Sequence, residues 1–268
     1  METIRDEGRR SGLRRVISDR TRWGRPVAVG LTLVFAGIGI TILTVGVTSV
    51  AGSHIAGLDI RHYLGGTQRW LETGTPYFQN EVAGPFQIDP LTYLHPPVAV
   101  YLFAPFLVLP LALWWAIPLG IVGWSVATWR PADWTWPVMA ALLALSRFYI
   151  PLLVGNTDLW VWAAIAAGLR FAWPALLVVV KPSLFPFMFI GIRHRSWWIG
   201  ALIVLLICLP FGSLWVDWIS VVRNAPKDIT YSLANVPWLL VPVIAWAGRT
   251  RPTGSPFFIR SLGTLGGH

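Results

Sequence analysis

The sequence predicts an all-α, polytopic helical membrane protein of about eight spans. The chain is 55% hydrophobic and only 12% charged, whereas a soluble domain of this length carries about twice that charged fraction. Apolar segments of near-span length recur along it. Seventeen Trp are present, many of them at the edges of these segments, where Trp favours the headgroup level of a bilayer.

The charges are unevenly distributed. Residues 1–26 hold eight Arg against four acids, whereas residues 50–95 hold four acids against two Arg. Basic residues that cluster at segment ends follow the positive-inside rule, which places the N-terminus in the cytoplasm and residues 50–95 outside. Because no soluble basic domain is present, nucleic acid is not predicted as a partner. The single cysteine, Cys208, excludes a disulfide framework and a thiolate metal site.

Three regions follow from this pattern. Residues 1–26 form an Arg-rich tail that is disordered or lies on the cytoplasmic leaflet, 27–248 form one transmembrane domain, and 249–268 form a second cytoplasmic tail. The first span, 27–49, lacks a small-residue cleavage site and is expected to be retained. The protein is therefore expected in the plasma membrane.

The later spans are less regular. Residues 97–129 are expected to turn back near the cytoplasmic face at Pro110, and 130–133 form a short outside turn. The segments 157–169 and 236–248 are short for a bilayer core of about 30 Å. The number of spans therefore stays open between seven and nine.

The first outside loop, residues 50–95, is the longest polar stretch between apolar segments. Its residues 59–72 can form an interfacial helix that ends at Gly74-Thr75-Pro76. Asp59 is either the N-cap of this helix or a base that takes a proton from an acceptor hydroxyl. A metal cluster of His54, His62, His95, Asp59 and Asp89 is conceivable, but the spacings match no closed metal motif, so no metal or other cofactor is predicted.

Charges inside the apolar segments are candidates for function because they are costly there. These are Asp158, Lys181 and, less strongly, Arg147. The Lys181-Pro182 break would place a cation beside freed backbone groups, which suits a phosphate. The structural alternatives are snorkelling for Lys181 and an N-cap for Asp158.

The order of motifs resembles the C-type integral-membrane glycosyltransferases, and more closely the polyprenyl-phosphate-mannose-dependent mannosyltransferases of glycosyltransferase family 87. The matching features, spread over residues 27–245, are Asp59 after span one, Tyr63 with Gly65, Gly74-Thr75-Pro76-Tyr77, Tyr93-Leu94-His95-Pro96-Pro97, Pro105 with Pro110, Gly155-Asn156-Thr157-Asp158, and Lys181-Pro182 before Arg193-His194-Arg195. Two departures stand out. Family members have a longer chain with more spans, and Asn156 stands where the family favours Gln.

The resemblance implies transfer of a sugar, habitually mannose, from a polyprenyl phosphate to a lipid or glycan hydroxyl at the outer face, with inversion. Asp59 would be the catalytic base and Asp89 its alternative. The candidates for binding the donor phosphate are Lys181, Arg61, Arg69, His95 and Arg223. The candidates for substrate binding are Tyr63, Tyr77, Asp89, Tyr93, Asn156 and Asp158.

Two other functions remain open. A non-catalytic relative could bind lipid or act as a scaffold, and it would show donor affinity without turnover. A small transporter would show internal pseudo-symmetry with a site at mid-membrane. The sequence contains no inverted repeat, and its polar residues gather at one surface.

Overall fold

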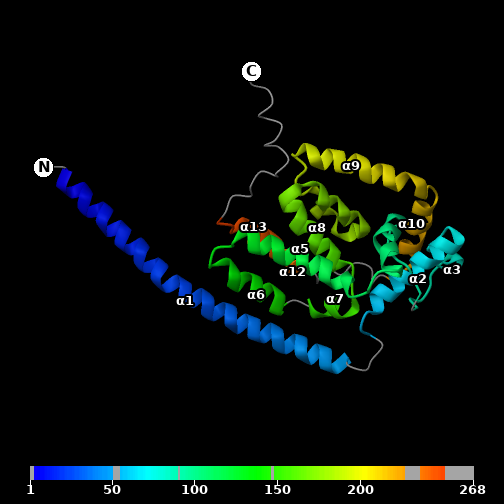
Figure 1. Ribbon diagram of the computed structural model, residues 1–268, viewed down its shortest axis with the longest axis horizontal. Coiled ribbons are helices and arrows are strands. Elements are labelled where there is room, and N and C mark those ends of the chain that lie inside the picture. Colours follow the sequence, from blue (N-terminus) through cyan, green and yellow to red (C-terminus); the bar gives the residue numbers. More distant parts are fainter. Residues whose placement is uncertain (1–2, 51–54, 90, 146–147, 227–235, 251–268) are drawn as a thin grey trace, which may run out of the picture.

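The computed structural model describes residues 3–50, 55–89, 91–145, 148–226 and 236–250 (Figure 1). The described residues form helices and one isolated β-bridge, between Pro131 and Arg249, which agrees with the all-α prediction. The α-helices are α1 Thr3–Val50, α2 Leu58–Thr73, α3 Gln79–Ala83, α4 Val100–Phe103, α5 Leu113–Trp129, α6 Thr135–Leu145, α7 Tyr149–Val154, α8 Asp158–Phe171, α9 Arg195–Cys208, α10 Leu214–Asn224, α12 Val236–Leu239 and α13 Val241–Ala247. The 3-10 helices are η1 Pro97–Ala99, η2 Ala104–Leu107, η3 Trp173–Val180, η4 Pro182–Phe189 and η5 Leu209–Phe211.

Helix α1 is the longest element and extends well beyond the body of the molecule (Figure 1). Its C-terminal part packs on α6 and α7. The helix begins at Thr3, so the expectation of disorder over residues 1–26 is wrong for residues 3–26, whereas the alternative that they lie on the cytoplasmic leaflet stays a prediction. They continue the helix of the first apolar segment.

The structure does not contain eight helices that are each long and apolar enough to span a membrane within its described residues, so the prediction of about eight spans is not supported. Within the described ranges, one helix is long and apolar enough to cross a bilayer, Gly24–Ser49 with a mean hydropathy of 2.3. A second counts only if Arg195–Phe211 and Leu214–Asn224, which meet at 86°, are taken as one span. Proline explains the difference, because Pro105, Pro174, Pro182 and Pro186 all lie in short 3-10 helices and proline disrupts a longer α-helix.

Two ends of the body can be distinguished by their contacts. At one end Arg25 lies 3.5 Å from Asp133, and Thr250 donates a backbone hydrogen bond to Arg130. Arg170 donates to Thr128 at 3.0 Å, and Ser196 donates to Phe171 at 3.1 Å. The turn 130–133 therefore lies beside Arg25 and Arg249, and its predicted position at the outer face, with residues 50–95, is wrong.

Helices α2, α3 and α10 gather at the opposite end (Figure 1). The segment η1–α4–η2 also stays there, because Trp114, which follows it, donates to Gly155 at 2.8 Å, and Trp115 donates to Leu152 at 2.7 Å. The break at Pro110 is present, since α5 begins at Leu113. However, the turn stays at the same end as α2, so its predicted position at the face opposite residues 50–95 is wrong.

Helix α2 confirms the helix predicted over residues 59–72. Gly74, with φ 81°, ends it by accepting a left-handed conformation that favours glycine. On its inner face Gly66 lies against Tyr93, which is fully buried. A Cβ at position 66 would lie 2.7 Å from Cγ and 2.9 Å from Cβ of Tyr93, so the helix can approach this ring only because residue 66 has no side chain.

The Gly66→Ala variant should therefore lower the free energy of unfolding by about 1–3 kcal/mol, as overpacking does. Thermal unfolding of the detergent-solubilised protein measures this. The control is Gly123→Ala in α5, where a Cβ meets nothing within 4 Å. Equal melting temperatures for the two variants would contradict the close packing of α2 on Tyr93.

Candidate active site

Several chain segments that are distant in sequence end at one cavity of about 490 Å³. The first turn of α2 forms one wall, and the residues before η1 form another. The α7–α8 junction, the η3–η4 junction and α10 complete it. Its lining consists of Leu58, Asp59, His62, Tyr63, Ile88, Thr92, Leu94, His95, Pro96, Asn156, Lys181, Pro182, Ser183, Trp218 and Val222.

Asp59 is held in this cavity by hydrogen bonds to other side chains and does not cap its own helix. The N-cap of α2 is Gly57, with φ 66°, and no side chain caps the helix, so the N-cap interpretation of Asp59 is wrong. Instead, its Oδ2 accepts a 2.5 Å hydrogen bond from Asn156 Nδ2 and a 3.3 Å bond from the hydroxyl of Tyr63. Burial raises the pKa of Asp59, while these two donors and nearby His62 and Lys181 oppose the rise.

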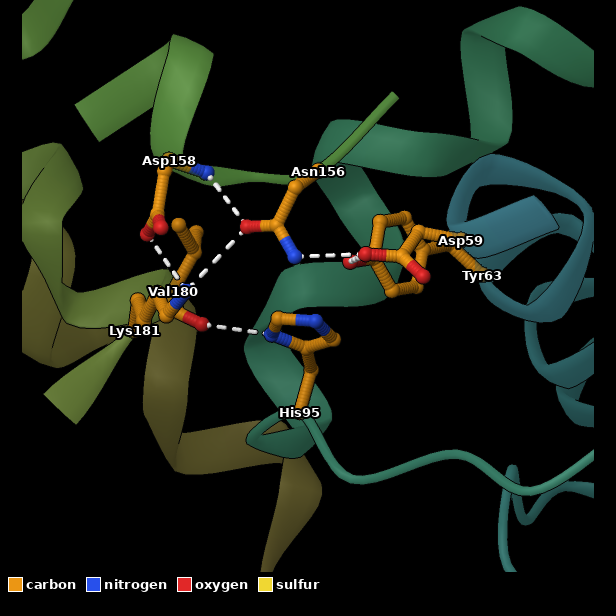
Figure 2. Close-up of polar contacts among 7 residues, drawn as sticks. All are labelled: Asp59, Tyr63, His95, Asn156, Asp158, Val180 and Lys181. Atoms are coloured by element: carbon orange, nitrogen blue, oxygen red, sulfur yellow. Dashed lines mark hydrogen bonds and ion pairs between the residues drawn. The ribbon is translucent and has the colours of Figure 1, made fainter. Parts of the chain in front are cut away.

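Asn156 lies between a carboxylate and an ammonium (Figure 2). It follows Gly155, whose φ of 73° ends α7. Its Oδ1 accepts from Lys181 Nζ at 3.1 Å and from the backbone N–H of Asp158 at 3.0 Å. Since both of these groups only donate, the amide oxygen must face them and the NH₂ group must face Asp59. The orientation of the amide is thus fixed by its partners.

Lys181 stands at the break between η3 and η4, as the sequence predicted for a Lys-Pro step. Its ammonium forms an ion pair with Asp158, whose side chain is 1% exposed. Asp158 is the first residue of α8, and Thr157 is the N-cap, without a side-chain cap bond. The N-cap interpretation of Asp158 is therefore wrong. Asp158 and Asn156 use two of the three donors of the ammonium.

His95 contributes a neutral imidazole. Its Nδ1 lies 3.0 Å from the carbonyl of Val180, and because a carbonyl only accepts, Nδ1 carries the proton. Burial lowers the pKa of His95 to about 4, with the Val180 carbonyl opposing the shift. The ring meets that of Tyr63 edge-on at 4.6 Å, and Tyr77 donates to the His95 carbonyl at 2.8 Å. Nε2 is left as an acceptor at the cavity.

The other predicted residues do not line the cavity. Arg61 and Arg223 are exposed. Arg69 donates to the carbonyls of Pro76 and Leu91 and stacks 3.3 Å above the Phe78 ring, so it fastens the loop that follows α2. The roles of Arg61, Arg69 and Arg223 in phosphate binding stay predictions.

Three of the predicted substrate-binding residues also lie outside the cavity lining. Asp89 is exposed and accepts from the backbone N–H of Leu91 at 2.9 Å, which is a turn contact. Tyr77 and Tyr93 are buried behind the cavity wall. Arg147 lies outside the described residues. The structure thus brings Asp59, Tyr63, His95, Asn156, Asp158 and Lys181 together.

The lining also contains residues that were not predicted as site residues, among them His62 and Trp218. His62 was considered only as a metal ligand, although a residue three positions after Asp59 shares its helix face. Trp218, on α10, donates to the carbonyl of Leu94 at 3.1 Å and covers one side of the cavity. Nothing in the sequence pointed to Trp218, because its partner is more than a hundred residues away.

Comparisons with known proteins give no relative: no family model, no curated protein and no solved structure matches the chain. In the described part of the chain, no three His, Cys, Asp or Glu side chains are grouped as metal ligands. His54 lies outside that part.

The hydrogen bond from Asn156 should lower the pKa of Asp59, since it stabilises the charged carboxylate. In Asn156→Ala the pKa should rise, and in Tyr63→Phe it should rise less. Dicyclohexylcarbodiimide, which reacts with protonated carboxyls, reports this as a labelling midpoint that moves to higher pH. Asn224→Ala is the control, because Asn224 does not line the cavity and its side chain donates to the carbonyls of Glu81 and Val82. An unchanged labelling midpoint in Asn156→Ala would show that the hydrogen bond from Asn156 does not lower the pKa of Asp59.

Proposed function

We propose that this protein is an integral-membrane glycosyltransferase that transfers a sugar, with mannose as the first candidate, from a polyprenyl phosphate to a hydroxyl acceptor, with inversion. The observation that carries the proposal is that Asp59 and Lys181 line one cavity and are joined through a single amide, Asn156. An inverting transfer from a phosphate needs a base for the acceptor hydroxyl and a cation for the leaving phosphate in the same cavity.

The chemistry divides between these groups. Asp59 takes the proton from the acceptor hydroxyl while its oxygen attacks the anomeric carbon and the bond from that carbon to the phosphate oxygen breaks. A raised pKa makes Asp59 a stronger base than an exposed aspartate. The leaving phosphate gains charge, and the remaining N–H of Lys181 can donate to it, a kind of contact worth about 3 kcal/mol.

The surface of the body supports residence in a membrane. Large apolar side chains are exposed along α1 and α9, for example Leu33 at 68% and Leu202 at 58%. Exposed apolar surface of this extent marks contact with lipid or a partner. Basic residues lie at the end opposite the cavity, which by the positive-inside rule supports a cytoplasmic position for that end; they are Arg25, Arg130, Arg193, Arg195 and Arg249.

Membrane insertion of the body also fits its short helices. Eleven-residue α6 and fourteen-residue α8 rise about 16 and 21 Å, less than a bilayer core of about 30 Å. The first residue of α8, Asp158, is buried, and Asn156 just before it lines the cavity, which is where a membrane tolerates non-helical backbone. We therefore propose a polytopic body in which, among the described helices, α1 is the one straight helix long enough to cross the bilayer unaided.

The Asp59→Asn variant should lose transfer from polyprenyl-phosphate mannose by roughly 10²–10⁴-fold, because it cannot accept the proton. Asp89→Asn is the matched control, since Asp89 belongs to the same loop, is exposed and does not line the cavity. Product formation by the purified protein in liposomes measures both. Full activity of Asp59→Asn would exclude Asp59 as the base, whereas donor binding without turnover in the natural protein would favour the lipid-binding alternative.

The sidedness can be tested by cysteine labelling in a Cys208→Ser background. A cysteine at exposed Gln87 should react with a membrane-impermeant maleimide in intact cells. A cysteine at exposed Ser196, at the opposite end, should react only after lysis. The reverse pattern would place the cavity in the cytoplasm.

A further inference from the structure

A second hollow lies on the outside of the body, between α1 and α7. We call it the α1–α7 groove; it has a volume of about 540 Å³ and is lined by α1 residues from Thr41 to Ser49, by Ile55, and by α7 residues from Tyr149 to Val154. It is separate from the cavity that holds Asp59. Nothing in the mechanism above uses it.

The chemistry of the α1–α7 groove suits a hydrocarbon chain. The hydroxyls of Thr41 and Ser49 donate back to carbonyls of their own helix, Gly37 at 2.9 Å and Val45 at 2.6 Å, so they offer no donor to a polar ligand. Val45 and Ile150 are 60% and 40% exposed and face the groove with apolar surface. Gly46 lies against the ring of Tyr149, where a Cβ would come within 2.9 Å of it, so α1 and α7 approach each other closely here.

The α1–α7 groove lies closer to the Asp59 side of the active site than to the Lys181 side. Gly57 donates to the carbonyl of Leu153 at 2.9 Å, which joins the start of α2 to the wall of the groove. Ile55 stands four residues before Asp59, and Val154 two residues before Asn156. By contrast, no groove residue neighbours Lys181 in sequence, and the Figure 2 view places Lys181 on the far side of Asn156 from Asp59.

The length of the groove along α1 is also close to the thickness of the hydrocarbon layer of one leaflet. From Thr41 to Ser49, α1 rises about 12 Å, close to half of a hydrocarbon core of about 30 Å. The groove lies next to the cavity end of α1, so a chain in it would have its headgroup at the level of α2.

From these observations we infer that the α1–α7 groove binds an acyl chain of the acceptor, which is therefore a membrane lipid with a hydroxyl-bearing headgroup. The inference rests on the proposed function. Asp59 must contact the acceptor hydroxyl, and the groove lies on the Asp59 side, whereas the donor phosphate is assigned to Lys181. The chain of the donor is thus not expected in this groove.

Photo-crosslinking tests the groove without requiring turnover. The full-length protein in phosphatidylcholine vesicles is given one of two probes, a phosphatidylinositol or a polyprenyl phosphate, each with a diazirine in its chain. The phosphatidylinositol probe should label peptides that contain Val45 and Ile150. Labelling should fall roughly ten-fold in Val45→Trp, which fills the groove, and stay unchanged in Val47→Trp, whose exposed side chain lies outside it.

Kinetics then connect the groove to the reaction. Val45→Trp should raise KM for a diacyl acceptor and leave KM unchanged for a deacylated acceptor with the same headgroup. Equal or stronger labelling of the groove by the polyprenyl probe, or equal labelling around Val47, would overturn the inference. Loss of activity with every acceptor, combined with acyl labelling of the groove, would instead count against the proposed function and leave the groove site standing.

Discussion

The side-chain amide of Asn156 connects polar groups from parts of the chain that are distant in sequence. It hydrogen-bonds Asp59 on α2 and Lys181 at the η3–η4 break, across 97 and 25 residues respectively. A charged group taken out of water without a partner is costly. The carboxylate and the ammonium are tolerated because each has a polar partner, and this fixes where α2, α8 and η4 begin relative to one another.

The short helices follow from the same constraint. A continuous span would carry its charged ends to opposite water layers, and Asp59, Asn156 and Lys181 could not meet. Proline after Lys181 and the left-handed Gly155 interrupt the apolar segments at this level, so polar groups and free backbone groups collect around one cavity. Two hydrophobic clusters, one at the start of α5 and one along its C-terminal part, then pack the interrupted pieces.

Local sequence features predicted the local structure well. The bounds of α2, the break at Lys181-Pro182 and the polar character of Gly155-Asn156-Thr157-Asp158 all follow from residue type and spacing. Long-range features did not. Hydropathy measures apolar length but not interruption, so it suggested full spans and put residues 130–133 at the wrong end. Arg69 and Asp89 looked like ligand groups because a charge in a polar loop carries no mark that its partner is a backbone carbonyl or N–H.

The contacts of helix α10 affect the direction from which a molecule can enter the cavity. Trp218 bonds the carbonyl of Leu94, and Asn224 bonds the carbonyls of Glu81 and Val82, so this helix is tied to the first loop at two places. Lifting it toward bulk water would break three hydrogen bonds, each with a net value of about 1 kcal/mol. A molecule that enters sideways between helices breaks none of these ties. Under the proposed function, α10 would therefore direct the substrates to enter in the plane of the bilayer and would shield the reacting sugar from water.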